Sequence, residues 1–482
     1  MEYGLIGMPL GHSFSQEIHE SLGWYRYELH PVEAADFPAF MEARAFRGIN
    51  VTIPYKQDVI PYLDEIDPLA AEIGAVNCIV NRNGKLCGYN TDLAGMQALV
   101  EKLGLDLRGK KVLICGTGGT SKTARTVARA AGAADVIRLS RTVKSGADFT
   151  DVITYAQAYI DHTDAQIIIN TTPSGMFPNN GEWAINAAAF SQLKGIIDAI
   201  YNPLETALVQ QGRALGVPAS GGLYMLVAQA VIAAEHFMGA AGEGESGAAD
   251  NCASVARDAD AAAADGNANA DTNAAHPAAA GKASGTKLTS STSAAAAAVA
   301  FPTTKAQLTA LCDRIFTQLE RKKRNIVLIG MPGCGKTTVG TLLAEKTGRT
   351  FIDTDQVIRE ISGKTPGQII NEAGEDVFRA IEAQAIAQAG KNTGCIISTG
   401  GGAILRPENV AALRQNGTLY FIDRPVDQLV PTNDRPLSNS AEKLVQLYDE
   451  RYPAYAACAD FTIPVNGSAA SVAQYIEERH FS

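Results

Sequence analysis

Paired cysteines, basic stretches and long apolar runs are scarce in this chain, and each shortage excludes a class of protein. The 482 residues include 8 cysteines and no Cys-x-x-Cys pair, which argues against a disulfide or zinc framework and favours a reduced, cytoplasmic protein. The net charge is −10 without a long basic stripe, so nucleic acid is not an expected partner. No stretch reaches the ~18–20 apolar residues of a membrane span, so no membrane partner is expected either. The N-terminus also lacks the pattern of a signal peptide.

Aromatic residues are missing from one long internal segment. Between Gly239 and about Thr304 the chain is mostly Ala, Gly, Asp, Asn, Ser and Thr, with no aromatic residue before Phe301. Such a composition cannot bury enough apolar surface to offset the entropy of ordering, so residues 240–304 are predicted to form a disordered linker. The linker divides the chain into two parts.

Both parts alternate strand-like runs with helical patterns, which predicts the α/β class with mainly parallel sheets. After the linker, apolar residues at three- and four-residue steps predict a helix over Lys305–Arg321. Residues Asn325–Ile329 then form a short apolar run that predicts a buried strand.

A glycine turn in the first part predicts a dinucleotide site. The apolar run Val112–Cys115 precedes three glycines and a helical pattern, so backbone N–H groups can meet a pyrophosphate at the helix start. The glycines are Gly116, Gly118 and Gly119. About 20–25 residues later, where an NAD site would place an acid, the chain has hydroxyl and basic residues instead. These are Ser140, Arg141, Thr142 and Lys144, which suit a 2′-phosphate and favour NADPH as the cofactor.

Three polar clusters lie outside this segment, at residues 7–15, 50–56 and 88–92. Each alone fits ordinary turn chemistry, and a lone lysine is usually solvated. In their order and spacing, however, the three clusters resemble shikimate dehydrogenase. Further short motifs at 74–77, 170–173, 198–203 and 222–229 extend the resemblance over nearly all of residues 1–239.

This resemblance implies a two-lobed enzyme that reduces 3-dehydroshikimate. Its substrate lobe would span 1–92 and 220–239, and its Rossmann NADP lobe 93–219. Lys56 and Asp92 would form the catalytic pair, since an ammonium group beside a carboxylate can stabilise and protonate the ketone oxygen that hydride attack makes negative. The backbone of Gly222 would lie near the nicotinamide. The substrate would be bound by Ser13, Ser15, Thr52, Asn77, Asp92, Tyr201 and Gln229. The chain departs from the family pattern at Gln16, where proline is usual, and at Lys122, where arginine is common.

The second part contains a phosphate-binding loop. Residues 330–337 match G-x-x-x-x-G-K-[ST] without a mismatch, after a strand and before a helical pattern. Lys336 is expected to reach the β/γ-phosphates of ATP, and Thr337 to ligate Mg²⁺. The predicted nucleotide-binding residues are Gly333, Cys334, Gly335, Lys336, Thr337 and Thr338.

The segments after this loop resemble shikimate kinase across about residues 324–482, within a predicted domain of 305–482. The resemblance rests on residues 351–355, 374–382, 398–402, 434–437 and 448–455. It implies a P-loop fold with a parallel sheet flanked by helices.

By this resemblance, Asp353 would help hold Mg²⁺, and Asp355 would bind shikimate and orient or deprotonate its attacking hydroxyl. Arg379 and Arg451 would bind the carboxylate, because guanidinium forks match that anion. Arg435, on a lid, would stabilise the transferring phosphoryl group. The substrate ring would contact the backbone of Gly400, Gly401 and Gly402. The lid region, 424–435, is shorter and poorer in arginine than is usual in the family.

Together the two resemblances predict a fusion that makes shikimate with NADPH and phosphorylates it with MgATP. Two alternatives stay open at this point. The first part could be a quinate/shikimate dehydrogenase that uses NAD, or a non-catalytic binding module attached to an active kinase. The sequence does not indicate an oligomeric state.

Overall fold

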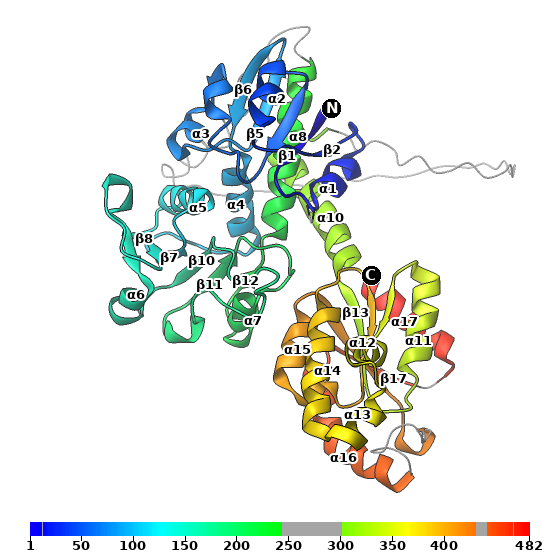
Figure 1. Ribbon diagram of the computed structural model, residues 1–482. Coiled ribbons are helices and arrows are strands. Elements are labelled where there is room, and N and C mark those ends of the chain that lie inside the picture. The colour runs from blue at the N-terminus through cyan, green and yellow to red at the C-terminus, as the bar shows by residue number, and fades with distance from the viewer. Residues whose placement is uncertain (12, 243–300, 430–440, 466) are drawn as a thin grey trace, which may run out of the picture.

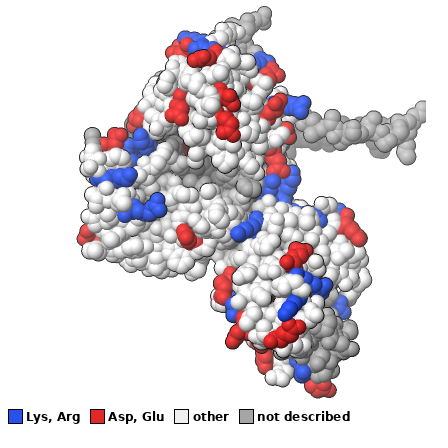
Figure 2. Space-filling model, viewed as in Figure 1, with Lys and Arg blue, Asp and Glu red and all other residues white. Residues whose placement is uncertain are grey.

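The computed structural model describes residues 1–11, 13–242, 301–429, 441–465 and 467–482 (Figure 1). The predicted linker lies almost entirely outside these residues, and so does Arg435. Among the helices described, none is long and apolar enough to cross a membrane. On the face shown in Figure 2, acidic and basic side chains are mixed over both domains.

The first lobe is a six-stranded mixed sheet in the order β2-β1-β3-β5-β6-β4. β1 pairs in parallel with β2 and β3, while β5 runs antiparallel to β3 and β6. The strands are β1 (Tyr3–Gly7), β2 (Glu28–Pro31), β3 (Gly48–Val51), β4 (Glu65–Ile66), β5 (Cys78–Arg82) and β6 (Lys85–Tyr89). Its helices are α1 (Ser15–Leu22), α2 (Phe37–Ala43) and α3 (Pro68–Ile73).

The second lobe is a parallel six-stranded sheet in the order β12-β11-β10-β7-β8-β9. Its central strands are continuous apolar runs because both faces are covered, as in Ile167–Ile169. The strands are β7 (Lys111–Cys115), β8 (Asp135–Ser140), β9 (Val152–Thr154), β10 (Ile167–Asn170), β11 (Gly195–Asp198) and β12 (Ala219–Ser220). The helices are α5 (Gly119–Ala130), α6 (Tyr155–Asp161) and α7 (Ala207–Ala214).

Two helices connect the lobes. α4 (Thr91–Lys102) leads from the first lobe into the second, and α8 (Leu223–Gly242) returns along it (Figure 1). The helices cross closely at Gly95, where an added methyl group would lie 2.7 Å from the carbonyl oxygen of Met225. Both helices start beside the cleft between the lobes, so their first turns can present side chains to it.

The second domain has a parallel five-stranded sheet in the order β14-β15-β13-β16-β17, with helices on both sides (Figure 1). The strands are β13 (Asn325–Ile329), β14 (Phe351–Asp353), β15 (Ile396–Ser398), β16 (Gly417–Asp423) and β17 (Phe461–Pro464). The helices are α11 (Lys336–Thr347), α12 (Thr354–Ser362), α13 (Pro366–Ala373), α14 (Glu375–Gly390), α15 (Pro407–Arg414), α16 (Ala441–Cys458) and α17 (Ala469–Phe481).

Helix α10 (Lys305–Lys323) joins the two domains, and Arg324 alone separates it from β13. The helix and the strand predicted here are both present. The sequence analysis placed this helix in the second domain, 305–482. In the structure its apolar face packs into the core of the first domain. Four buried residues of α10 belong to the core that α1, α4 and α8 form: Leu311, Cys312, Ile315 and Leu319. The two domains are therefore connected by a helix that is itself part of the first core.

Candidate active sites

A cavity of about 730 Å³ lies between the two lobes of the first domain. Eight residues that the sequence singled out for substrate and catalysis line it: Ser13, Ser15, Thr52, Lys56, Asn77, Asp92, Tyr201 and Gln229. Residues from the glycine turn of the second lobe and the residue before α8 complete the lining: Gly118, Gly119, Thr120 and Gly222. The cavity thus brings the predicted substrate residues and the predicted dinucleotide turn together.

Lys56 and Asp92 form an ion pair inside this cavity. Lys56 Nζ donates to Asp92 Oδ2 at 2.5 Å, and the side chains are 26% and 13% exposed. Asp92 lies in the first turn of α4, where the positive end of the helix favours a carboxylate. The backbone of Lys56 is fixed because its carbonyl accepts from the amide of Val76 at 2.8 Å. The arrangement places a proton donor beside a fixed negative charge.

A buried hydrogen-bond network holds the amide side chains of the cavity. Asn77 Oδ1 accepts from the amide of Thr91 at 2.7 Å, and Asn77 Nδ2 donates to Thr91 Oγ1 at 3.1 Å. Thr91 Oγ1 also lies 3.3 Å from Gln229 Oε1, to which it donates. Sequence reasoning gave Thr91 no role, although its position directly before Asp92 was a signal. Because these bonds join α4, α8 and the start of β5, the amides are pre-positioned for a ligand.

Asn50 is a second residue that sequence reasoning left without a role. It is buried at the cavity wall, accepts from Tyr27 Oη at 2.7 Å and donates to the carbonyl of Asn77 at 3.2 Å. An asparagine inside the apolar strand β3 was the available signal, because a buried amide needs partners.

The glycine turn fits a dinucleotide. Gly116 follows β7 with φ 109°, and a side chain at Gly118 or Gly119 would extend into open space. These two glycines lead into α5, whose N-terminal end attracts phosphate. Gly222 is required by packing, since a methyl group there would lie 2.6 Å from the carbonyl carbon of Ala199.

The residues predicted to bind the 2′-phosphate lie at the carboxyl end of β8 rather than in the cavity lining: Ser140, Arg141, Thr142 and Lys144. Their strand is adjacent to the glycine turn, because the amide of Gly116 donates to the carbonyl of Leu139 at 2.9 Å. Arg141 and Lys144 are exposed. Their contact with a cofactor therefore stays a prediction.

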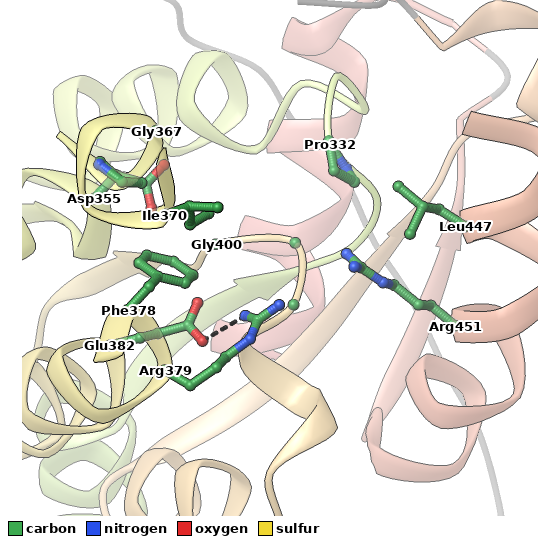
Figure 3. Close-up of a pocket in the computed structure, with 13 residues that line it drawn as sticks. Pro332, Asp355, Gly367, Ile370, Phe378, Arg379, Glu382, Gly400, Leu447 and Arg451 are labelled. Carbon is green, nitrogen blue, oxygen red and sulfur yellow. Dashed lines mark hydrogen bonds and ion pairs between the residues drawn. The ribbon is translucent and has the colours of Figure 1, made fainter. Parts of the chain in front are cut away.

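In the second domain, Asp355, Arg379 and Arg451 line one pocket with Pro332 of the phosphate-binding loop (Figure 3). Gly400, Gly401 and Gly402 complete its wall. Figure 3 shows both guanidinium groups directed toward this glycine turn, one from α14 and one from α16. The sequence prediction that these residues converge is consistent with this placement.

Arg379 is held by two carboxylates. It is 8% exposed, and its guanidinium donates to Glu382 at 2.7 Å and to Glu375 at 2.9 Å. Burial raises the pKa of Glu382, and the neighbouring Arg379 opposes that shift without cancelling it. Gly402 leaves space for the guanidinium, because a methyl group there would lie 2.8 Å from Arg379 Cζ. Glu382 had no predicted role, although its spacing of three residues from Arg379 on a helix was a signal.

The predicted phosphate-binding loop follows the central strand β13 and places a lysine beside the two residues predicted to hold Mg²⁺. Gly333 and Gly335 have φ 77° and 100°, the left-handed region that glycine allows. Lys336 begins α11, and its Nζ donates to the carbonyls of Gly330 at 2.8 Å and Met331 at 2.9 Å. The loop therefore curves around its own lysine, as a phosphate cradle requires.

Thr337 Oγ1 donates to Asp353 Oδ2 at 3.1 Å, so the two predicted Mg²⁺ residues are adjacent. Asp353 also accepts from the amide of Asp355 at 3.0 Å, capping α12 and fixing the Asp353 carboxylate at the end of β14. Cys334 is buried, and Thr338 follows in α11. Arg424 Nε donates to the carbonyl of Cys334 at 3.1 Å, which adds positive charge beside the loop.

Comparison with known proteins agrees with the family resemblances predicted for both halves of the chain. A family model described as the shikimate dehydrogenase substrate binding domain matches residues 5–79, and one described as shikimate kinase matches residues 332–480. The shikimate dehydrogenase (NADP(+)) of Halothermothrix orenii is 40% identical over 257 residues, covering 48% of this chain and 88% of that protein. The enzyme of the same name from Geobacillus kaustophilus is 37% identical over 257 residues, with 49% and 92% covered. The crystal structure of shikimate dehydrogenase 1 from Peptoclostridium difficile is 32% identical, with a TM-score of 0.46 and coverage of 54% and 97%.

The chain thus combines an oxidoreductase, with a cavity beside a glycine turn, and a P-loop phosphotransferase with a pocket lined by two arginines. By its similarity to these relatives, it belongs to the shikimate dehydrogenase family. With the kinase segment included, it is a fusion of a shikimate dehydrogenase and a shikimate kinase, which confirms the sequence prediction. These families imply NADPH and ATP as cofactors.

Proposed function

We propose that the chain carries out two consecutive steps on one cyclohexene acid. The first domain reduces the ketone of 3-dehydroshikimate, and the second phosphorylates the hydroxyl group that the reduction creates. Each domain has a cavity in which a small-molecule substrate could bind. We assign 1–92 with 220–239 to the substrate lobe, 93–219 to the NADP lobe and 240–304 to a linker. Within the predicted kinase segment 305–482, α10 belongs to the first core, and we assign 324–482 to the kinase domain. The observation that carries the first activity is the Lys56–Asp92 pair, 2.5 Å apart beside the glycine turn.

In the first domain, Ser13 and Ser15 would bind the substrate carboxylate with their hydroxyl groups. Thr52, Asn77, Tyr201 and Gln229 would line and bind the ring. NADPH, when bound, supplies the hydride. As negative charge develops on the ketone oxygen, the ammonium of Lys56 stabilises it and donates the proton, while Asp92 holds the ammonium in place. Arg141 and its neighbours would bind the 2′-phosphate, so NADPH should be preferred to NADH.

In the second domain, the charges of Arg379 and Arg451 would bind the shikimate carboxylate from two sides. Asp355 would accept a hydrogen bond from the attacking hydroxyl and take its proton. ATP with Mg²⁺, when bound, supplies the phosphoryl group. Lys336 would neutralise charge on the β/γ-phosphates, and Thr337 and Asp353 would hold the metal. Arg435, which lies outside the described residues, would stabilise the transferring phosphoryl group.

A coupled assay of the whole chain with 3-dehydroshikimate, NADPH and MgATP tests the proposal. Lys56→Ala should abolish NADPH oxidation while phosphorylation of added shikimate continues. Lys336→Ala should do the reverse. Lys85→Ala and Lys364→Ala are matched controls, since both lysines form exposed ion pairs and neither lines a cavity.

The two activities fail separately. If the wild-type chain phosphorylates shikimate but does not oxidise NADPH, the first domain is a binding module and the assignment of Lys56 is wrong. If NADH supports the same kcat/KM as NADPH, the proposed role of Arg141 is wrong. Neither result would affect the kinase assignment.

A further inference from the structure

The end of α10 and the kinase domain contact two of the loops that line the dehydrogenase cavity. One is the segment 13–17, which carries the two predicted carboxylate-binding serines and starts α1. The other is the loop 199–206, which carries Tyr201 and follows β11. The contacts come from the end of α10, from Arg324 and from the turn between α15 and β16.

At the first loop, Lys323 is the central contact. Its Nζ lies 2.6 Å from Glu17 Oε2 and 4.5 Å from the centre of the Phe14 ring, and Lys322 pairs with the same carboxylate. Burial alone would raise the pKa of Glu17, but the two neighbouring lysines lower it below its ordinary value. Phe14 stands between Ser13 and Ser15, so fixing its ring fixes the serines on either side.

At the second loop, two backbone amides donate hydrogen bonds to the kinase domain. The amide of Leu204 donates to Asn416 Oδ1, and the amide of Glu205 donates to the carbonyl of Gln415, both at 2.9 Å. Arg324 adds an ion pair with Glu205 at 2.9 Å. Asn416 is fully buried and bonded to the kinase backbone through Gly390, so it is a fixed support.

The two loops, 13–17 and 199–206, contact each other inside the dehydrogenase. The rings of Phe14 and Tyr201 are 5.3 Å apart, and Tyr201 lines the cavity. The same loop packs against the start of α8, because a methyl group at Gly221 would lie 2.6 Å from the carbonyl oxygen of Leu204. A shift of either loop would therefore change the substrate side of the cavity.

We propose that the connection to the kinase domain, made by the end of α10, by Arg324 and by the turn between α15 and β16, positions the substrate-binding loops of the dehydrogenase, with Lys323 and Arg324 as positioning residues. The inference rests on the proposed roles of Ser13, Ser15 and Tyr201. The proposal predicts that loss of these contacts changes the KM for 3-dehydroshikimate and not the KM for NADPH. The contacts reach the loop of Ser13 and Ser15 and the loop of Tyr201 rather than the glycine turn at Gly116.

Lys323→Met and Arg324→Met in the full chain test the proposal. Each should raise the KM for 3-dehydroshikimate about three- to tenfold while the KM for NADPH changes less than about twofold. Kinase kinetics should not change, which shows that the second domain remains folded. Lys323→Arg retains the ion pair and the ring contact and should restore the KM. Lys346→Met is the matched control, because that lysine pairs with Glu477 inside the kinase domain.

Wild-type kinetics are measured first, so failure of the proposed function is recognised separately. If wild type reduces 3-dehydroshikimate but both methionine variants keep its KM, the positioning role is wrong. A parallel rise in both KM values with a lower Tm would show general destabilisation and would also overturn it. Failure of Lys323→Arg to restore the KM would overturn the role of that residue.

Discussion

Replacing Arg379 by methionine should separate shikimate binding from the stability of the kinase domain. Arg379 is the hydrogen-bond partner of Glu382 in the described structure, and Glu382 is only 1% exposed. Arg379→Met therefore leaves a buried carboxylate without its partner, a change that costs about 3–5 kcal/mol when the charge is retained. The variant should lose stability and also lose one of the two cations predicted to bind the substrate.

The loss of stability has an upper limit, because Glu382 can take up a proton instead. From an ordinary pKa of 4.5, protonation costs about 3.4 kcal/mol at pH 7 and about 0.7 kcal/mol at pH 5. Loss of the arginine raises the pKa of Glu382 further above its unfolded value, so stability is retained at low pH and lost as pH rises. We expect a destabilisation of up to about 3 kcal/mol at pH 7 and less than about 1 kcal/mol at pH 5.

A second substitution removes the buried charge. Arg379→Met with Glu382→Gln should return stability to within about 1 kcal/mol of wild type at both pH values. The KM for shikimate should stay raised by about 30-fold or more in both variants, equivalent to about 2 kcal/mol of lost charge-assisted binding. Arg406→Met is the matched control, because Arg406 pairs with Glu408 at the surface.

Calorimetry is the suitable assay for stability. Both tryptophans, Trp24 and Trp183, lie in the first domain, so their fluorescence monitors the dehydrogenase and provides an internal reference. If Arg379→Met unfolds with the wild-type profile at pH 7, or if the double variant is as unstable as the single one, the reasoning about the buried pair is wrong. A normal KM for shikimate in either variant would refute the binding role of Arg379.

Three further predictions concern single residues. Gly402→Ala should lower the kinase kcat/KM for shikimate by about tenfold or more, because the methyl group would overlap the arginine of the pocket, and it should leave NADPH oxidation unchanged. Burial raises the pKa of Glu235 to about 7 from 4.5, so the stability it contributes below pH 4.5 is lost as pH rises through 7. Glu235→Gln should remove on the order of 2–3 kcal/mol of this pH dependence, measured as the free energy of unfolding in urea by tryptophan fluorescence. An unchanged dependence of that free energy on pH would refute the prediction. Thr337→Val removes the hydroxyl that donates to Asp353 and should raise the Mg²⁺ concentration needed for half-maximal kinase activity about tenfold, with no change expected in the dehydrogenase.

The parts of the site that the sequence predicted best are contiguous in the chain. The phosphate-binding loop at 330–337 carries its own turn glycines, lysine and hydroxyl, so its local geometry follows from eight residues. Lys56 and Asp92 are 36 residues apart, and only the resemblance to a family paired them before the structure did. Glu382 and Thr91 needed the structure, because their role is to hold other side chains rather than to contact a ligand.

The domain against which α10 packs could also not be predicted from the sequence. Its apolar stripe predicts that one face is buried, but the stripe does not say which neighbour covers it. The helix precedes a kinase strand directly, so its sequence position favoured the second domain. Packing against α8 instead places the domain boundary after Lys323, and Arg324 is the residue at that boundary.

Contacts across the boundary leave little trace in the sequence, since several are made by backbone atoms. The bond from the Glu205 amide to the Gln415 carbonyl involves no side chain, and any residue except proline at position 205 could make it. Without the kinase, the amides of Leu204 and Glu205 would lose these partners and bond to water, which does not hold the loop in one position. The second domain therefore supplies hydrogen-bond partners that the first domain's own loop lacks, and the loop in question is the one that carries Tyr201 into the substrate cavity.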